Sequence, residues 1–146
     1  MKSGQIKLVQ KTFEKVRPIS DTVVELFYNR LFELRPSFKA LFKGDMKTQD
    51  KMLIQMIDYA VSGLDNPDTI LPTIQDLGKR HVGYGVKEEY YDTVGESLLW
   101  TLEKGLGNNF TPEVKDAWAA AYKLLSDTMK STAREADQVE VNDKKR

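Results

Sequence analysis

The amino-acid sequence predicts a single all-α domain, and three observations support this fold class. Apolar residues recur at spacings of three and four along most of the chain, which is the period of an amphipathic helix. No segment shows the sustained alternation of apolar and polar residues that a half-buried strand would have. The chain has 146 residues, the length of one domain. A domain of this size buries about 68–70% of the surface of its unfolded chain, enough for a core with room for a ligand.

The first half of the chain contains four predicted helices, over about 6–16, 24–34, 36–42 and 48–64. Pro18 ends the first helix, Pro36 fits the first turn of the short third one, and Gly44 ends that short helix. Gly63 and the polar cluster 65–68 close the fourth. The inward faces are predicted to be Ile6, Val9, Phe13 and Val16, then Val24, Phe27, Leu31 and Leu34, then Phe38, Leu41 and Phe42, and last Leu53, Met56 or Ile57, Ala60 and Leu64.

The second half contains three further predicted helices, over about 67–81, 91–102 and 114–129. Asn66 followed by Pro67 suits a helix cap and first position, and Gly83 ends that helix. Thr111 and Pro112 give the last helix a capping hydroxyl and a proline at its first position. The residues after 132 have no large apolar side chains apart from two valines. We therefore predict a domain over 1–132 and a charged, flexible tail, beginning as a frayed helix end, over 133–146.

Composition excludes several classes of function. Lys and Arg together number 22, as do Asp and Glu, so no net field would attract nucleic acid or an anionic membrane. The absence of cysteine excludes disulfides, thiolate catalysis, iron–sulfur clusters and thioether attachment of a pigment. No apolar signal core or membrane-length apolar segment is present, so a cytoplasmic protein is expected.

The single histidine, His81, is the most informative residue for function. It lies in the segment Asp76–Val86, and in a chain without cysteine it is the only conventional nitrogen ligand for iron. In isolation, a histidine in a helical protein is more often a surface residue or a hydrogen-bonded core residue than a metal ligand. Whether it binds a metal therefore depends on the residues elsewhere in the chain.

Several other residues form the pattern that a haem crevice opposite His81 would need. Gln49 and Leu53 are four residues apart, so they share one helix face, and Tyr28 places a phenol in a core-facing run. Phe42 is an aromatic residue that could pack against a flat macrocycle. Leu77 lies one turn before His81, and its carbonyl is within helical reach of the imidazole Nδ1 hydrogen, which would leave Nε2 as the ligand.

Together these residues and their spacing resemble a bacterial single-domain globin, similar to the haem domain of flavohaemoglobins. The resemblance extends from about Gly4 to Met129. The residues that carry it are Phe27-Tyr28, Pro36, Leu41-Phe42, Gln49 with Leu53, Leu77-Gly78-Lys79-Arg80-His81, Tyr91, Val94-Gly95-Glu96, Leu98-Leu99 and Ala117-Trp118-Ala119-Ala120-Ala121-Tyr122.

The resemblance implies a three-over-three helical sandwich, a non-covalent haem b and a set of roles for particular residues. His81 is implied as the proximal iron ligand, Phe42 as the aromatic stacked on the haem, and Leu53 as an apolar gate. Tyr28 and Gln49 are implied as the distal hydrogen-bonding pair. Leu77 would pack under the macrocycle, and Tyr91 and Val94 would line the proximal and lower pocket.

Each of these residues also has an ordinary structural interpretation. Phe42 and Leu53 could belong to the core, Gln49 could be a solvated residue at a helix start, and Tyr28 could lie at the protein boundary with its hydroxyl in water. Only their combination with His81 favours the haem pocket.

The resemblance implies reversible binding of a small gas such as oxygen, nitric oxide or carbon monoxide. A phenol donor at Tyr28 would add a charge-assisted hydrogen bond of about 1.5–3 kcal/mol to oxygen, so tight binding is expected. An enzyme is the alternative, either a nitric oxide dioxygenase or a nitrite reductase served by an external reductase. A haem-free helical interaction module is the third hypothesis.

Two details of the sequence bear on the chemistry at the iron. With no second histidine, closure of the iron by two histidines is impossible, and Tyr28 as phenolate, or Met52 or Lys51 after a helix shift, could be an internal sixth ligand of ferric iron. Flavohaemoglobins support the proximal histidine with a glutamate, whereas the ungapped match here is Ala133, and Glu135 would reach only from a displaced helix end. Peroxidase-like electron donation to the iron is therefore not expected.

Overall fold

The computed structural model describes the backbone of residues 1–42 and 44–144, and the side chains of that part up to residue 135. Within it, α-helices joined by short turns and 3-10 helices account for most of the backbone, and no strand is present, so the predicted all-α class is confirmed. The elements in order are α1 (Ser3–Val16), η1 (Arg17–Ile19), α2 (Ser20–Leu34), η2 (Pro36–Leu41), α3 (Met46–Ser62), α4 (Pro67–Gly83), α5 (Tyr90–Leu106), η3 (Gly107–Asn109) and α6 (Pro112–Lys144).

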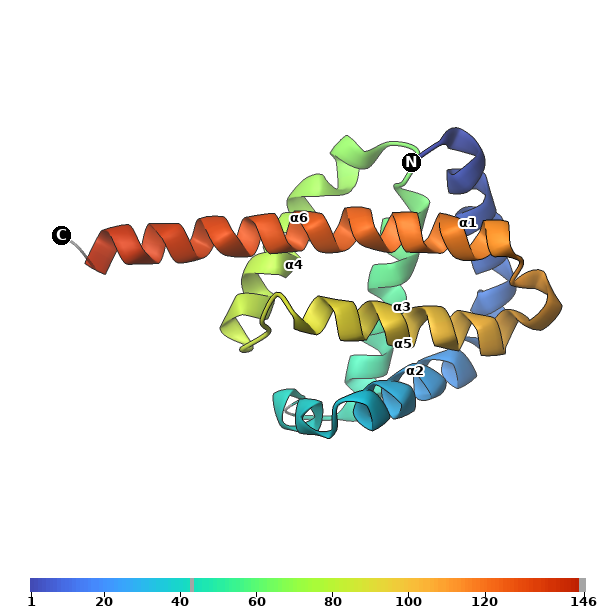
Figure 1. Ribbon diagram of the computed structural model, residues 1–146, viewed down its shortest axis with the longest axis horizontal. Helices are drawn as coiled ribbons and strands as arrows, with labels where there is room; N and C mark the ends of the chain where they lie inside the picture. Colours follow the sequence, from blue (N-terminus) through green and yellow to red (C-terminus); the bar gives the residue numbers. More distant parts are fainter. Residues whose placement is uncertain (43, 145–146) are drawn as a thin grey trace.

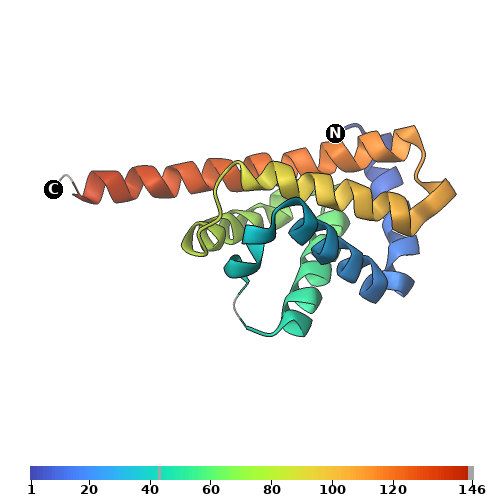
Figure 2. The same cartoon turned by 60° about the horizontal axis from the view of Figure 1, so that its bottom comes forward.

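The helices pack in two layers of three. In one layer α3 contacts both α1 and α4, and in the other α5 contacts both α2 and α6. The layers meet where α4 and α1 pack on α6 and where α2 packs on α3. Figures 1 and 2 show α5 and α6 side by side, and in Figure 1 α3 runs across their direction. This arrangement matches the three-over-three sandwich that the resemblance implies.

The helix starts and ends lie where proline, glycine and capping side chains are placed in the sequence. Asp45 caps α3, because its Oδ1 accepts a hydrogen bond from the Lys47 backbone N–H at 3.1 Å. Thr111 Oγ1 accepts from the Val114 backbone N–H at 3.3 Å, as predicted for the start of α6. Pro67 and Pro112 are the first residues of α4 and α6, where the missing N–H removes no helical hydrogen bond.

The largest hydrophobic cluster joins α1 to α5 and α6, away from His81. Phe13 and Trp118 pack with their ring centroids 6.3 Å apart, and both side chains are buried. The Trp118 indole N–H donates to Thr12 Oγ1 at 2.8 Å, so the buried indole is satisfied. This cluster supports the fold and leaves the residues around α3, α4 and η2 to form the site.

The last helix is longer than predicted. Its backbone is helical to Lys144, and in Figures 1 and 2 it extends past the other helices. The segment 133–136, Ala-Arg-Glu-Ala, consists of residues with high helix propensity, which accounts for the continued helix where large apolar residues are lacking. The domain boundary at residue 132 and the tail over 133–146 stay predictions, and residues 145–146 lie outside the described part.

None of the helices in the described part of the chain has the length and apolar character needed to cross a membrane.

Candidate haem site

His81 lies on the last turn of α4 with its imidazole held in one orientation. Its Nδ1 is 2.8 Å from the Leu77 carbonyl oxygen, as the helical spacing predicts. Because a carbonyl can only accept, Nδ1 carries the hydrogen and Nε2 carries the free lone pair. Burial lowers the pKa of His81, an effect that the Leu77 hydrogen bond opposes and Arg80 reinforces. The ring is therefore neutral near pH 7, in the form that binds a metal.

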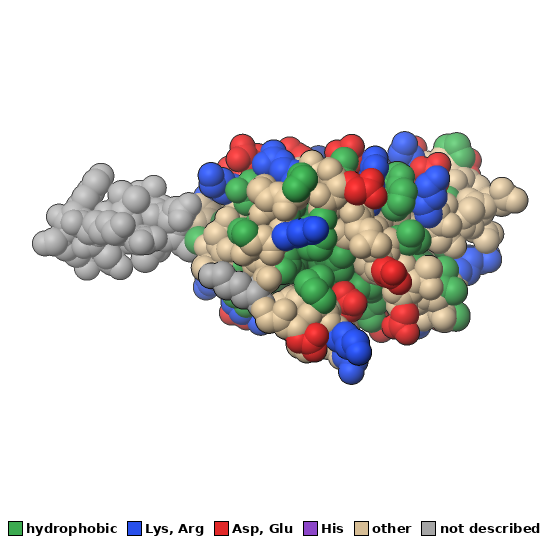
Figure 3. Space-filling model, turned by 90° about the horizontal axis from the view of Figure 1, so that it is seen from below, with side chains coloured by type: hydrophobic (Ala, Val, Ile, Leu, Met, Phe, Trp, Pro, Cys, Tyr) green, Lys and Arg blue, Asp and Glu red, His purple; other side chains and the backbone are tan. Residues whose placement is uncertain are grey.

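A first hydrophobic cluster contains four of the predicted pocket residues. Tyr28 from α2 is buried in it, and Phe42, Leu53 and Val94 pack against it while only partly buried. The Tyr28 and Phe42 ring centroids are 5.3 Å apart in an edge-to-face arrangement. Figure 3 shows one face of the molecule with hydrophobic side chains gathered near its centre and charged side chains mostly around them. Partly buried aromatic and aliphatic side chains of this kind suit one wall of a pocket for a flat apolar group.

A second hydrophobic cluster lies on the other side of the proposed crevice. Tyr91 is buried in it, and Leu77 packs against it together with Met56 from α3. The two clusters follow one another along α3, through Leu53 and Met56, and along α5, through Val94 and Tyr91. The structure therefore places Val94 with the Tyr28 cluster and Tyr91 with the cluster that includes Leu77.

The Tyr28 hydroxyl is available as a hydrogen-bond donor. Burial raises the pKa of Tyr28 to about 12, with a smaller contribution from Asp50, so the phenol is protonated near pH 7. Among the described residues, none forms a hydrogen bond with this hydroxyl. The side chain is 7% exposed, so the phenol is held by its packed ring while its hydroxyl is free to donate to a ligand.

The other predicted distal residue, Gln49, is half-buried on the first turns of α3, one turn before Leu53. Its backbone N–H bonds to the Asp45 carbonyl at 3.2 Å, so the start of α3 sets its position. The alternative iron ligands on this helix point outward. Met52 is 49% exposed and Lys51 is exposed, which leaves Tyr28 as the predicted alternative with a buried side chain.

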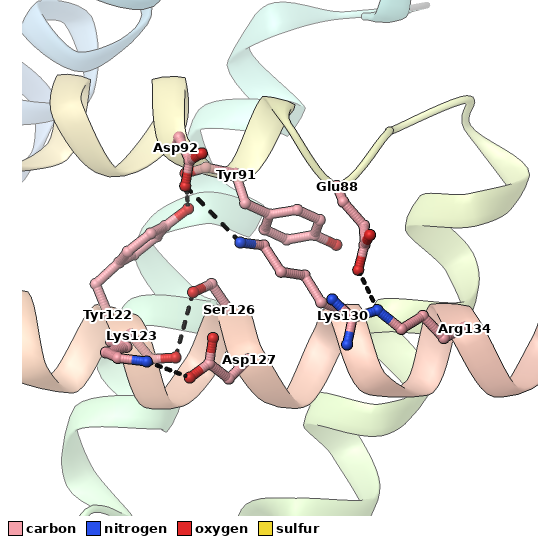
Figure 4. Close-up of polar contacts among 9 residues, drawn as sticks. All are labelled: Glu88, Tyr91, Asp92, Tyr122, Lys123, Ser126, Asp127, Lys130 and Arg134. Atoms are coloured by element: carbon pink, nitrogen blue, oxygen red, sulfur yellow. Dashed lines mark hydrogen bonds and ion pairs between the residues drawn. The ribbon is translucent and has the colours of Figure 1, made fainter.

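On the proximal side of the site, polar contacts join α6 to the start of α5 and to the connection before it, as Figure 4 shows. The Tyr122 hydroxyl donates to the Tyr91 carbonyl at 2.5 Å. Lys130 pairs with Asp92 at 3.8 Å, and one turn later Arg134 Nε lies 2.5 Å from Glu88 Oε1 in the α4–α5 connection. Both pairs include an exposed carboxylate, so each contributes less than about 1 kcal/mol to stability.

A surface hollow of about 530 Å³ lies beside this network, lined by residues that include Val82, Tyr91 and Arg134. Ala133, which the resemblance sets at the position of a supporting glutamate, lines this hollow and carries no carboxylate. Glu135 is exposed, and Glu88 is engaged by Arg134. Among the described residues, the only hydrogen-bond partner of the His81 ring is the Leu77 carbonyl.

The structure adds two aromatic residues that the sequence analysis missed. Phe32 stacks on Tyr28 with ring centroids 6.0 Å apart, and its position four residues after Tyr28 on one helix could have indicated this contact. Tyr84 is 57% exposed and lies 5.9 Å from the His81 ring, centroid to centroid. Tyr84 lies in the turn after α4, where the apolar spacing of a helix cannot indicate which residues come into contact.

The residues present fit a haem group. They include one neutral imidazole with a free Nε2, a phenol and two apolar clusters, and this combination is what an all-α haem protein needs. Within the described residues, no cluster of three His, Cys, Asp or Glu side chains could hold a bare metal ion instead.

Comparison with known proteins agrees with this class. The family model described as Globin matches residues 25–129. The chain is 32% identical over 125 residues to a flavohemoprotein from Rhodopirellula baltica and 34% identical over 128 residues to one from Xylella fastidiosa strain 9a5c. These matches cover 84% and 86% of this chain but only 31% and 32% of those relatives, so the chain spans about a third of their length.

Two solved structures share the fold at low sequence identity. One is described as an engineered carbene transferase and putative nitric oxide dioxygenase from Rhodothermus marinus, with a TM-score of 0.88, 22% identity and coverage of 97% of this chain and 99% of that one. The other is a bacterial globin from Campylobacter jejuni, with a TM-score of 0.82, 22% identity and coverage of 94% and 99%. The chain belongs to the globin family and has its all-α fold, and membership of this family implies a haem cofactor.

Proposed function

We propose that this protein binds haem b through His81 and reversibly binds oxygen or another small gas in a distal pocket formed by Tyr28 and Gln49. The observation that carries the proposal is the arrangement of the only histidine, whose Nδ1 is engaged by Leu77 so that Nε2 is free. Haem b supplies an iron atom with an open coordination position for a diatomic gas. In this proposal Phe42, Leu53, Leu77, Tyr91 and Val94 line the haem.

The roles of the protein side chains follow from their chemistry. The Leu77 carbonyl orients the imidazole and fixes its tautomer. Tyr28, protonated near pH 7 and without an acceptor among the described residues, donates to a polar gas ligand, and Gln49 adds a second donor or holds the phenol. Because the proximal imidazole has a carbonyl partner and no carboxylate, it is a weaker electron donor than a carboxylate-linked histidine.

The first test is the visible absorption spectrum of the protein reconstituted with haemin, reduced, and exposed to oxygen and carbon monoxide. We expect stable ligand spectra from the parent and their loss in His81→Ala. The matched control is Tyr84→Ala, which removes an exposed aromatic side chain near His81 but no ligand. If the parent retains no haem, or His81→Ala has the spectrum of the parent, the haem pocket is wrong and a haem-free interaction module is favoured.

A second candidate function is nitric oxide dioxygenation or nitrite reduction with electrons from an external reductase. Its support is the similarity to flavohemoproteins. The discriminating measurement is nitric oxide consumption with and without a reductase system. Many turnovers per haem would identify an enzyme, whereas consumption of one equivalent would show reactivity alone. The cytoplasmic location stays a prediction from the sequence.

A further inference from the structure

The helix that carries His81 crosses α6 at unusually close range. Gly78 is buried at this crossing, and a Cβ at its position would lie 3.0 Å from both the Cα and the carbonyl oxygen of Met129. Both atoms belong to the backbone of α6, so a rotamer change cannot make room. A Cβ at position 78 would be tighter against α6 than most Cβ contacts, so a side chain there requires α4 and α6 to separate by a few tenths of an ångström.

His81 follows Gly78 by three residues, which is less than one helical turn. Between them α4 is continuous helix, and the Leu77 carbonyl that orients the imidazole belongs to the same turn. A displacement of α4 at Gly78 consequently moves the imidazole and its hydrogen-bond partner together. The imidazole would keep its orientation within the helix and change its position relative to the rest of the domain.

The same helix, α6, also holds the start of α5, which carries Tyr91. Figure 4 shows that Tyr122, Lys130 and Arg134 of α6 hold the start of α5 and the connection before it. Tyr91 therefore has its position set by α6 through a 2.5 Å hydrogen bond to its carbonyl. Since α6 is the common reference for α4 and α5, the Gly78 contact determines where His81 lies relative to the pocket wall.

We propose that Gly78 is a positioning residue for the proximal histidine, and that its close contact with the Met129 backbone sets the height of His81 over the haem. This inference rests on the proposed haem function. A side chain at position 78 would place the imidazole away from its natural distance to the iron. The effect passes through His81 and not through any contact of Gly78 with the haem.

The test compares Gly78→Ala with Gly83→Ala. Gly83 is the last residue of the same helix, and a Cβ there has open space around it, so the control carries the same substitution two residues beyond the histidine. The readouts are the iron–histidine stretching band of the ferrous protein by resonance Raman spectroscopy and the rate of haem transfer to excess apomyoglobin. We expect a shifted band and roughly tenfold faster haem loss, equivalent to about 1.4 kcal/mol, in Gly78→Ala alone.

A second pair of variants distinguishes an effect on the position of His81 from a general disturbance of the haem pocket. In His81→Gly supplemented with free imidazole, the proximal ligand is not attached to α4. Adding Gly78→Ala to this background should leave the iron–imidazole band and the haem loss rate unchanged. If the same changes appear there, the effect does not pass through His81 and the proposal is overturned.

The remaining outcomes are equally decisive. Met129→Ala should not restore Gly78→Ala, because the contact is with backbone atoms, and full restoration would contradict the geometry. An unfolded Gly78→Ala apoprotein by far-ultraviolet circular dichroism, beside a folded Gly83→Ala, would show that the contact supports the whole fold and would overturn positioning. If the parent itself binds no haem, the proposed function fails; if the parent binds haem and Gly78→Ala matches it, only this inference fails.

Discussion

Replacing Tyr28 by Phe should speed oxygen release without weakening the fold. The ring of Tyr28 packs among Phe27, Phe32 and Phe42 at centroid distances of 5.2, 6.0 and 5.3 Å, and phenylalanine keeps these contacts. Only the hydroxyl is lost, and it has no hydrogen-bond partner among the described residues. We therefore expect the free energy of unfolding of the apoprotein to change by less than about 1 kcal/mol, or to increase.

The magnitude of the kinetic effect follows from the environment of the hydroxyl. Tyr28 is only 7% exposed, and its pKa of about 12 keeps the phenol protonated, so it donates from a poorly solvated position. A hydrogen bond to a group with anionic character is worth about 1.5–3 kcal/mol. At about 1.4 kcal/mol per factor of ten, its loss accelerates oxygen release by about one to two decades.

The assay is stopped-flow measurement of oxygen release from the reconstituted ferrous protein, beside urea unfolding of the apoprotein. The matched control is Tyr59→Phe, which removes a phenol that is 40% exposed and lies 3.2 Å from Thr73 Oγ1. The control should leave oxygen release unchanged. An unchanged release rate in Tyr28→Phe would mean that Tyr28 does not face the gas ligand, and the proposed distal pocket would have to be abandoned.

Two further predictions concern stability. Thr101 is fully buried and its hydroxyl has no partner among the described residues, so Thr101→Val should raise the free energy of unfolding by about 1 kcal/mol. Ser97→Ala removes a donor to the Phe27 carbonyl at 2.8 Å and should lower the free energy of unfolding by about the same amount. Urea unfolding that ranks the two variants in the opposite order would contradict this reasoning. Because burial lowers the pKa of His81 in the folded apoprotein, the unfolded chain takes up this proton at higher pH, and apoprotein stability that is present above about pH 6.5 should fall as the pH drops below that value. His81→Gln should reduce this loss between about pH 7.5 and about pH 5.5, and an equal loss in both proteins would show that other groups cause it.

The helices could be predicted from the sequence because their signals are local. Apolar spacing located the long helices, and residues such as Pro67, Thr111 and Pro112 marked where they begin. The end of α6 was predicted too early, because the disappearance of large apolar residues was interpreted as the end of the helix. The high helix propensity of residues 133–136 carries the helix past that point without them, and the backbone is helical to Lys144.

Part of the candidate site could also be predicted from the sequence. The Nδ1 contact of His81 with the Leu77 carbonyl depends only on positions four residues apart in one helix, and the structure contains it. Phe32 could have been found by the same rule, because it follows Tyr28 by four residues. The roles of Tyr28 and Gln49 toward a gas ligand, by contrast, stay predictions.

The sequence by itself determined the all-α class, the main helix starts and the candidacy of His81, since each depends on residue type and on spacing within a few turns. Only the tertiary structure decided which helices approach one another and how closely. At the crossing of α4 and α6, Gly78 contacts the Met129 backbone, and the Tyr122 hydroxyl donates to the Tyr91 carbonyl. Both contacts join residues that are far apart in the chain. Such contacts depend on how several packed helices fill one volume together, and that is a property of their arrangement in space that no local sequence pattern contains.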